Sequence, residues 1–144
     1  VQLKGLETLS IRLERMCANA LKLARFMAER PEIGRVVYPG LDSHPQYALA
    51  QRQMKGAGSL ITFELAAGGE AAFRFLNGLE LIDISNNLGD SKSLITHPST
   101  TTHRAMGEEG RAQIGITDAM VRLSVGLEDV EDLKEDLDRA LQAI

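Results

Sequence analysis

The spacing of apolar residues predicts a long helix at the start of the chain. Between Leu6 and Met27 apolar residues recur every three or four positions, which places them on one helix face. Charged residues fall mostly elsewhere. Pro31 ends the pattern, because proline lacks the N–H that continues a helical hydrogen-bond ladder. We therefore expect a long linking helix over residues 1–30, followed by a folded domain over residues 31–144.

The rest of the chain alternates short strands with helices. Residues 59–65 and 120–125 alternate apolar and polar positions, the pattern of a strand with one buried face. Further strands are expected at residues 35–38, 79–84 and 93–96, and helices at residues 43–54, 70–77, 106–115 and 129–144. Together these elements predict an α+β fold, with a mostly antiparallel sheet and helices packed mainly on one side.

Composition narrows the classes of partner and location. An apolar fraction of 44% with 25% charged residues is ordinary for a soluble globular protein. A net charge of -4 and only four Phe and two Tyr argue against nucleic acid, and no apolar run is long enough to cross a bilayer. The single cysteine, Cys17, cannot form an internal disulfide, so we expect a packed thiol in a cytoplasmic protein. Because the chain does not begin with Met, we also expect a fragment of a longer polypeptide.

Arg122 is the most informative single residue. Val121, Leu123 and Val125 share one face of their predicted strand, so Arg122 and Ser124 point to the other face. A guanidinium offers a planar fork of donors that matches a carboxylate, which favours an amino-acid ligand. The alternative is an ordinary surface arginine that is solvated or paired with an acid.

The polar stretch from Asn86 to His103 adds further candidates. Asn86 and Asn87, which precede Leu88 and Gly89, could present side-chain amides and backbone N–H groups to a ligand oxygen, although asparagine and glycine are also common in turns. Thr102, in a run of three threonines, could line a polar pocket or simply occupy a loop. His97 and His103 have no third ligand at a recognisable spacing, so we expect structural imidazoles and no metal site.

No catalytic centre is evident within this chain. Neither nucleotide-binding glycine motif occurs, and no nucleophile motif or pair of catalytic carboxylates stands out. All five lysines lie in polar or charged surroundings, whereas imine chemistry needs a lysine with a depressed pKa. The pattern alone indicates a binding part without catalytic residues.

Several motifs resemble one enzyme family. Residues 87–98 (NLGDSKSLITHP), Thr102-His103, residues 115–117 (GIT) and residues 121–129 (VRLSVGLED) are similar to the C-terminal domain of the Cys/Met-metabolism pyridoxal-phosphate enzymes. Residues 37–41 (VYPGL) and His44-Pro45 fit the same pattern. The resemblance covers essentially the whole chain and is greatest to the O-succinylhomoserine sulfhydrylase branch.

The resemblance implies roles for individual residues. Arg122 occupies the family position that binds the substrate α-carboxylate, so residues 31–144 would form a substrate-binding domain. Asn87 stands where the lyases commonly have serine, and Thr102 matches a threonine near the mouth of the active site. The cofactor lysine of the family lies in a larger preceding domain that this chain lacks. We therefore expect pyridoxal phosphate in the full-length enzyme only.

The implied reaction is replacement of succinate on O-succinylhomoserine by a sulfur nucleophile, as in methionine biosynthesis. The full-length enzyme would be a homotetramer. Two alternatives remain open: a cystathionine γ-synthase or γ-lyase of the same family, and a non-catalytic module that binds carboxylates or a partner subunit.

Overall fold

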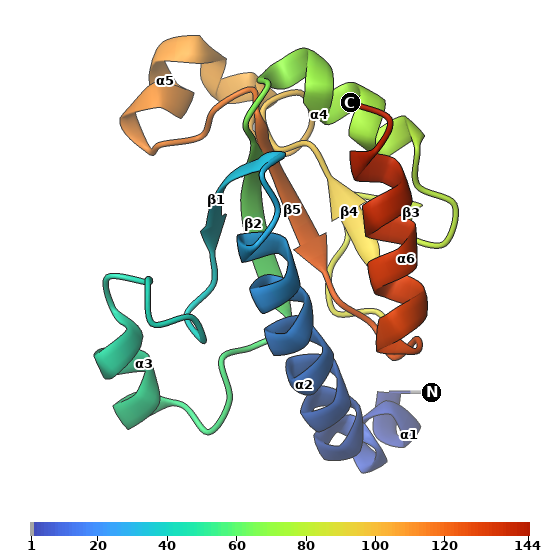
Figure 1. Cartoon of the computed structure of the whole chain (residues 1–144). Coiled ribbons are helices and arrows are strands. Elements are labelled where there is room, and N and C mark those ends of the chain that lie inside the picture. Colours follow the sequence, from blue (N-terminus) through green and yellow to red (C-terminus); the bar gives the residue numbers. More distant parts are fainter. Residues whose placement is uncertain (1) are drawn as a thin grey trace.

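The fold is built on a single five-stranded sheet (Figure 1). The computed structural model describes residues 2–144. The strand order is β1 (Ile33–Val37), β2 (Leu60–Leu65), β5 (Met120–Ser124), β4 (Leu94–Thr96) and β3 (Asp83–Ile84). All neighbouring strands are antiparallel except β3 and β4, which are parallel. The predicted α+β fold with a mostly antiparallel sheet is therefore confirmed.

Three helices cover one face of this sheet and form the core with it. They are α2 (Leu9–Ala28), α4 (Gly69–Asn77) and α6 (Val130–Leu141), and Figure 1 shows α2 and α6 side by side in front of the strands. Phe63 of β2 meets Phe75 of α4 edge to face at 5.7 Å. The side chains of Val121 and Leu123 in β5 are completely buried, so the predicted alternation of β5 is correct on this side.

The expected single N-terminal helix is two helices. The first, α1 (Gln2–Glu7), is separated from α2 at Thr8, where φ is -108° and ψ is 5°. Arg12 stabilises the break, because its Nη2 donates to the Gly5 carbonyl at 2.6 Å in place of a backbone N–H. The apolar stripe is buried only from Met16 onward, whereas Leu6 is 64% exposed. The second half of α2 thus belongs to the core.

The predicted strand at residues 79–84 is shorter than expected. Only Asp83 and Ile84 pair with β4. The preceding N–H groups of Glu80, Leu81 and Ile82 instead donate to the carboxylate of Asp136 in α6, at 2.8, 3.1 and 2.9 Å. These donors are satisfied by a helix side chain, so the segment does not extend the strand ladder.

The remaining helices are short and lie outside the three-helix layer. They are α3 (Tyr47–Gln53), the 3-10 turn η1 (Arg104–Met106) and α5 (Gly107–Gln113). The predicted helices at residues 43–54 and 106–115 are therefore present with later starts, and those at 70–77 and 129–144 match α4 and α6 closely. Within residues 2–144, no helix is both long enough and apolar enough to traverse a bilayer.

Candidate functional site

Arg122 lies on the sheet face that the three helices leave uncovered. Strand pairing places it between Thr62 of β2 and Thr96 of β4, and Val37 of β1 extends the same row. The Arg122 side chain is half-buried, while its neighbours along the strand, Val121 and Leu123, face the core. The sequence prediction for the orientation of Arg122 is confirmed.

The loop between β3 and β4 folds over one end of this face. Ser124 Oγ accepts a hydrogen bond from the Gly89 N–H at 2.9 Å, and the Glu128 carboxylate accepts from the Ser93 N–H at 2.6 Å. Gly126 permits the close approach, because a Cβ there would lie 2.4 Å from the Ser91 carbonyl oxygen. These bonds join the polar stretch from Asn86 to His103 directly to the segment that carries Arg122. Ser124 is committed to holding the loop and is not free to bind a ligand.

The guanidinium of Arg122 contacts this loop through a neutral oxygen. Its Nη2 donates to the Asn86 carbonyl at 2.9 Å, and its Nε–H is buried without an acceptor among residues 2–144. Arg30 and Arg111 are also half-buried, but each pairs with an aspartate, Asp138 at 2.8 Å and Asp118 at 3.8 Å. Arg122 has no such ion pair within the described chain, so its positive charge is available to an anionic ligand.

The charged side chains of the loop, Asp90 and Lys92, have partners other than Arg122. Hydrogen bonds from the Lys92 N–H and from Ser91 lower the pKa of Asp90. The hydrogen bond to Asp83 raises the pKa of Lys92, and the Nζ–Oδ2 distance is 2.5 Å. Neither Asp90 nor Asp83 forms an ion pair with Arg122 within residues 2–144.

The four sequence-predicted site residues do not form one cluster of mutual contacts. The Asn87 N–H donates to Ser85 Oγ at 3.3 Å, and the Asn87 side chain is exposed. Leu88 is 54% exposed on the same loop. Thr102 is exposed, and its Oγ1 lies 2.8 Å from His103 Nδ1. It makes no hydrogen bond to Arg122. Asn87 and Leu88 lie beside the residue that Arg122 contacts, and their role as ligands stays a prediction.

Sequence reasoning considered Asn86 and Thr101 only within larger groups of polar residues, and it did not single out Thr96. Asn86, weighed only together with Asn87, is the direct partner of Arg122, and its Oδ1 accepts from Thr96 Oγ1 at 2.8 Å. Thr101 Oγ1 lies 2.9 Å from Thr96 Oγ1 and donates to the His97 carbonyl at 2.7 Å. No sequence signal separates Asn86 from Asn87, but the cross-strand position of Thr96 follows once the register is known.

His97 is a structural residue, as predicted. Its ring is almost completely buried, with Nε2 2.7 Å from the Asp118 carbonyl and Nδ1 2.9 Å from Thr100 Oγ1. Because a carbonyl only accepts, Nε2 carries the proton and Nδ1 accepts from the Thr100 hydroxyl. The ring also packs on Phe73, with centroids 4.8 Å apart.

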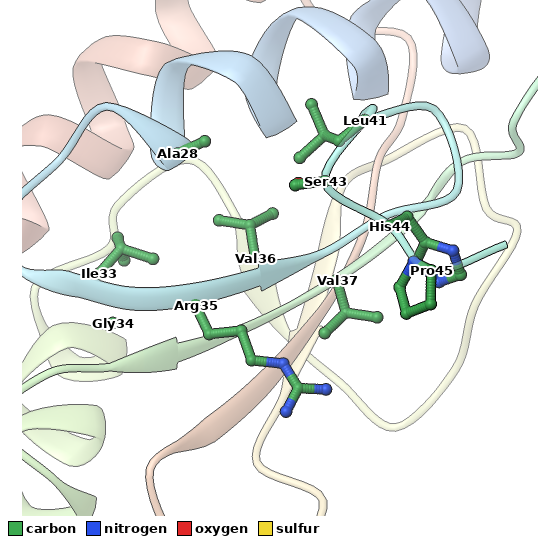
Figure 2. A pocket seen from close by; sticks show the side chains of 10 residues that line it. All are labelled: Ala28, Ile33, Gly34, Arg35, Val36, Val37, Leu41, Ser43, His44 and Pro45. Carbon is green, nitrogen blue, oxygen red and sulfur yellow. The ribbon is translucent and has the colours of Figure 1, made fainter. Parts of the chain in front are cut away.

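A cavity of about 700 Å³ lies at a different place, along the outer edge of β1. Figure 2 shows Val36 and Leu41 on one side of the strand and Arg35 and Val37 on the other. One strand, β2, separates β1 from the strand that carries Arg122, and the side chains that line the cavity are mostly apolar. The loop-facing surface around Arg122 is the better candidate site, because it combines an unpaired charge with fixed polar groups.

Comparison with known proteins identifies the family. The family model "Cys/Met metabolism PLP-dependent enzyme" matches residues 1–142. This chain belongs to that family. O-succinylhomoserine sulfhydrylase of Mycobacterium tuberculosis is 57% identical over 145 residues, and L-methionine gamma-lyase of Fusobacterium nucleatum is 47% identical over 142 residues. The crystal structure of metB from Corynebacterium glutamicum matches with a TM-score of 0.91 at 42% identity over 96% of this chain.

The chain spans about a third of the length of these relatives. The alignment with the M. tuberculosis protein covers 98% of this chain but only 36% of that protein. The match to the metB structure covers 35% of the metB chain. The family depends on pyridoxal phosphate, and its members named above include both a sulfhydrylase and a lyase.

The lysines of residues 2–144 do not fit an attachment point for this cofactor. None of the five is buried, and two of them are held in surface ion pairs, Lys92 with Asp83 and Lys134 with Glu131. A Schiff-base lysine needs burial or a cationic neighbour that lowers its pKa.

Proposed function

We propose that this chain is the substrate-binding part of a pyridoxal-phosphate-dependent O-succinylhomoserine sulfhydrylase, in which Arg122 binds the α-carboxylate of the substrate. The most similar relative named above carries that activity at 57% identity. In the full-length protein, a sulfur nucleophile replaces succinate on the amino-acid substrate. The polypeptide that supplies the cofactor lies outside this chain, and the assembly is a cytoplasmic homotetramer.

The observation that carries the proposal is the state of the Arg122 guanidinium. One Nη donor is bound to the neutral Asn86 carbonyl, and the buried Nε–H has no acceptor in residues 2–144. A buried donor without an acceptor costs about 1–3 kcal/mol, and an incoming carboxylate relieves that cost. A carboxylate is also the ligand whose geometry matches the guanidinium fork.

The neighbouring loop contributes further donors in this proposal. The exposed side-chain amide of Asn87 and the backbone N–H of Leu88 follow directly after the Arg122 partner Asn86. They would bind the second oxygen of the carboxylate. Thr102 would line the approach to the site. Holding the acid end of an amino acid in this way fixes the orientation of its reacting carbon atoms.

A cystathionine γ-synthase or γ-lyase is the second candidate, because a methionine γ-lyase is 47% identical to this chain. The full-length enzyme should be assayed with O-succinylhomoserine plus sulfide, then with cysteine, methionine and cystathionine. Homocysteine formation from sulfide supports the sulfhydrylase. Cleavage of methionine or cystathionine without use of either thiol refutes it, and no turnover of any substrate supports a non-catalytic module.

Replacement of Arg122 tests the carboxylate role directly. Arg122→Leu should raise KM for the amino-acid substrate at least about 100-fold while the cofactor stays bound, because a charge-assisted bidentate pair is lost. Unchanged kinetics would remove Arg122 from the site.

A further inference from the structure

Asn86 is held at two points, by its main chain and by its side chain. Its carbonyl oxygen accepts from Arg122 Nη2 at 2.9 Å, and its Oδ1 accepts from Thr96 Oγ1 at 2.8 Å. Thr96 is in turn the cross-strand neighbour of Arg122 on β4. The three residues close a ring, in which strand pairing fixes two members and Asn86 joins them from the loop.

The ring is anchored from behind by buried groups. Thr96 is 1% exposed, and its hydroxyl lies 2.9 Å from that of Thr101. Thr101 donates to the carbonyl of His97, whose ring is fixed at both nitrogens. Thr96 donates its one hydroxyl hydrogen to Asn86, and its buried place in β4, opposite Arg122 of β5, keeps that hydroxyl from shifting without disturbing the sheet. This is the arrangement that a precisely aimed binding group requires.

We infer that Asn86 is a positioning residue for Arg122. The Thr96–Asn86 hydrogen bond fixes the loop carbonyl that holds Nη2, and so aims the remaining donors of the guanidinium at the substrate. The inference rests on the proposed function of Arg122 as the carboxylate-binding residue. An arginine side chain loses considerable rotamer freedom when a ligand immobilises it, and holding the head group in advance reduces that loss on binding.

The neighbouring Asn87 lacks these attachments. Its N–H donates to Ser85 Oγ at 3.3 Å, and its side chain makes no hydrogen bond within residues 2–144. The two asparagines therefore have different tasks: Asn86 orients Arg122, whereas Asn87 is free to meet the ligand.

Two substitutions in the full-length enzyme break the same hydrogen bond from opposite ends. Asn86→Ala removes Oδ1 and keeps the backbone carbonyl, and Thr96→Val removes the hydroxyl and keeps the side-chain shape. Each should raise KM for the amino-acid substrate about fivefold and change kcat less than about twofold, as expected for one lost hydrogen bond in ground-state binding. The double variant should be no worse than either single one, because both remove one interaction.

Conservative and matched controls separate positioning from general damage. Thr96→Ser keeps the hydroxyl and should retain the KM of the unmodified enzyme. Thr117→Val makes the same chemical change at an exposed threonine whose hydroxyl bonds Glu64 at 3.3 Å, and it should have no effect on KM. Thermal unfolding of each variant verifies that the protein is folded.

A binding measurement tests whether the effect passes through Arg122. Competitive inhibition should be measured with L-norleucine, which has no leaving group, and with its α-amide. The inhibition constant for norleucine should rise about fivefold in Asn86→Ala, in line with one lost hydrogen bond, whereas that for the amide should stay unchanged. An equal rise for both ligands would overturn the positioning role, because the carboxylate would then not be involved.

The Arg122→Leu variant distinguishes the two possible failures. If Arg122→Leu leaves KM unchanged, the proposed function of Arg122 fails. If Arg122→Leu raises KM while Asn86→Ala and Thr96→Val do not, the positioning role alone is refuted.

Discussion

Replacement of Asp136 by alanine should be among the most damaging single changes in this fold. Asp136 is 2% exposed on α6 and accepts hydrogen bonds from three consecutive backbone N–H groups, those of Glu80, Leu81 and Ile82. Its carboxylate also meets Arg139, which retains Glu80 as a second partner at 3.4 Å. This one side chain therefore attaches the segment before β3 to the helical layer.

The magnitude follows from the groups that lose their acceptor. A hydrogen bond to a charged group contributes about 1.5–3 kcal/mol, and a buried donor left unsatisfied costs about 1–3 kcal/mol. The Ile82 N–H is buried, whereas those of Glu80 and Leu81 are only partly buried and can be reached by water. Counting the buried group fully and the other two in part, we expect Asp136→Ala to lower the free energy of unfolding by about 4 kcal/mol.

Urea unfolding measures this loss, and Glu135→Ala is the matched control. Glu135 is an exposed acid on the same helix, so its replacement should change stability by less than about 0.5 kcal/mol. Asp136→Asn keeps the shape and one acceptor oxygen and should fall between the two. Amide hydrogen exchange should accelerate selectively at residues 80–82 in Asp136→Ala. If Asp136→Ala costs no more than Glu135→Ala, the reasoning from these three donors is wrong.

Three further predictions concern other parts of the molecule. Burial, reinforced by repulsion from Cys17, raises the pKa of Tyr38 to about 12 from 10.0. The neutral Tyr38 therefore makes its full contribution to the free energy of unfolding below about pH 10, and this contribution is lost as the pH rises toward about 12. The difference in tyrosinate absorbance between the protein and Tyr38→Phe measures this titration. Gly126→Ala should destabilise the protein by about 1–3 kcal/mol in urea unfolding, because its Cβ meets the Ser91 carbonyl. Residues 1–144 alone should show no internal-aldimine absorbance with pyridoxal phosphate, because no lysine is buried.

Sequence patterns identified the elements whose signal is local. Alternation in β2 and β5 gave the buried face directly, since Ile61, Phe63 and Leu65 are all at most 2% exposed. The spacing of apolar residues in α6 was equally informative, and the helix begins after the capping residue Asp129, whose side chain accepts from the Glu131 N–H. In each of these elements, the residue types at neighbouring positions in the sequence decide which side chains are buried.

The departures share one cause, a side chain that bonds to the main chain of another segment. The strand predicted at residues 79–84 is short because its N–H groups find an acceptor in Asp136, more than fifty positions later in the chain. The helix break at Thr8 depends on the Arg12 side chain reaching back to Gly5. The pairing of Arg122 with Asn86, not Asn87, depends on how the loop settles over the sheet. No periodicity encodes contacts of this kind.

The residues after Arg122 explain why the binding strand and the loop behave as one unit. Ser124 holds the Gly89 N–H, Gly126 admits the Ser91 carbonyl, and Glu128 accepts from Ser93. Only Ser124 belongs to β5, so the strand repeat that orients Arg122 also orients Ser124, whereas Gly126 and Glu128 continue the attachment beyond the end of the strand. A shift of β5 by one residue would turn Arg122 and Ser124 to the opposite face together. The register of β5 therefore fixes the position of Arg122, and the loop holds its guanidinium through the Asn86 carbonyl.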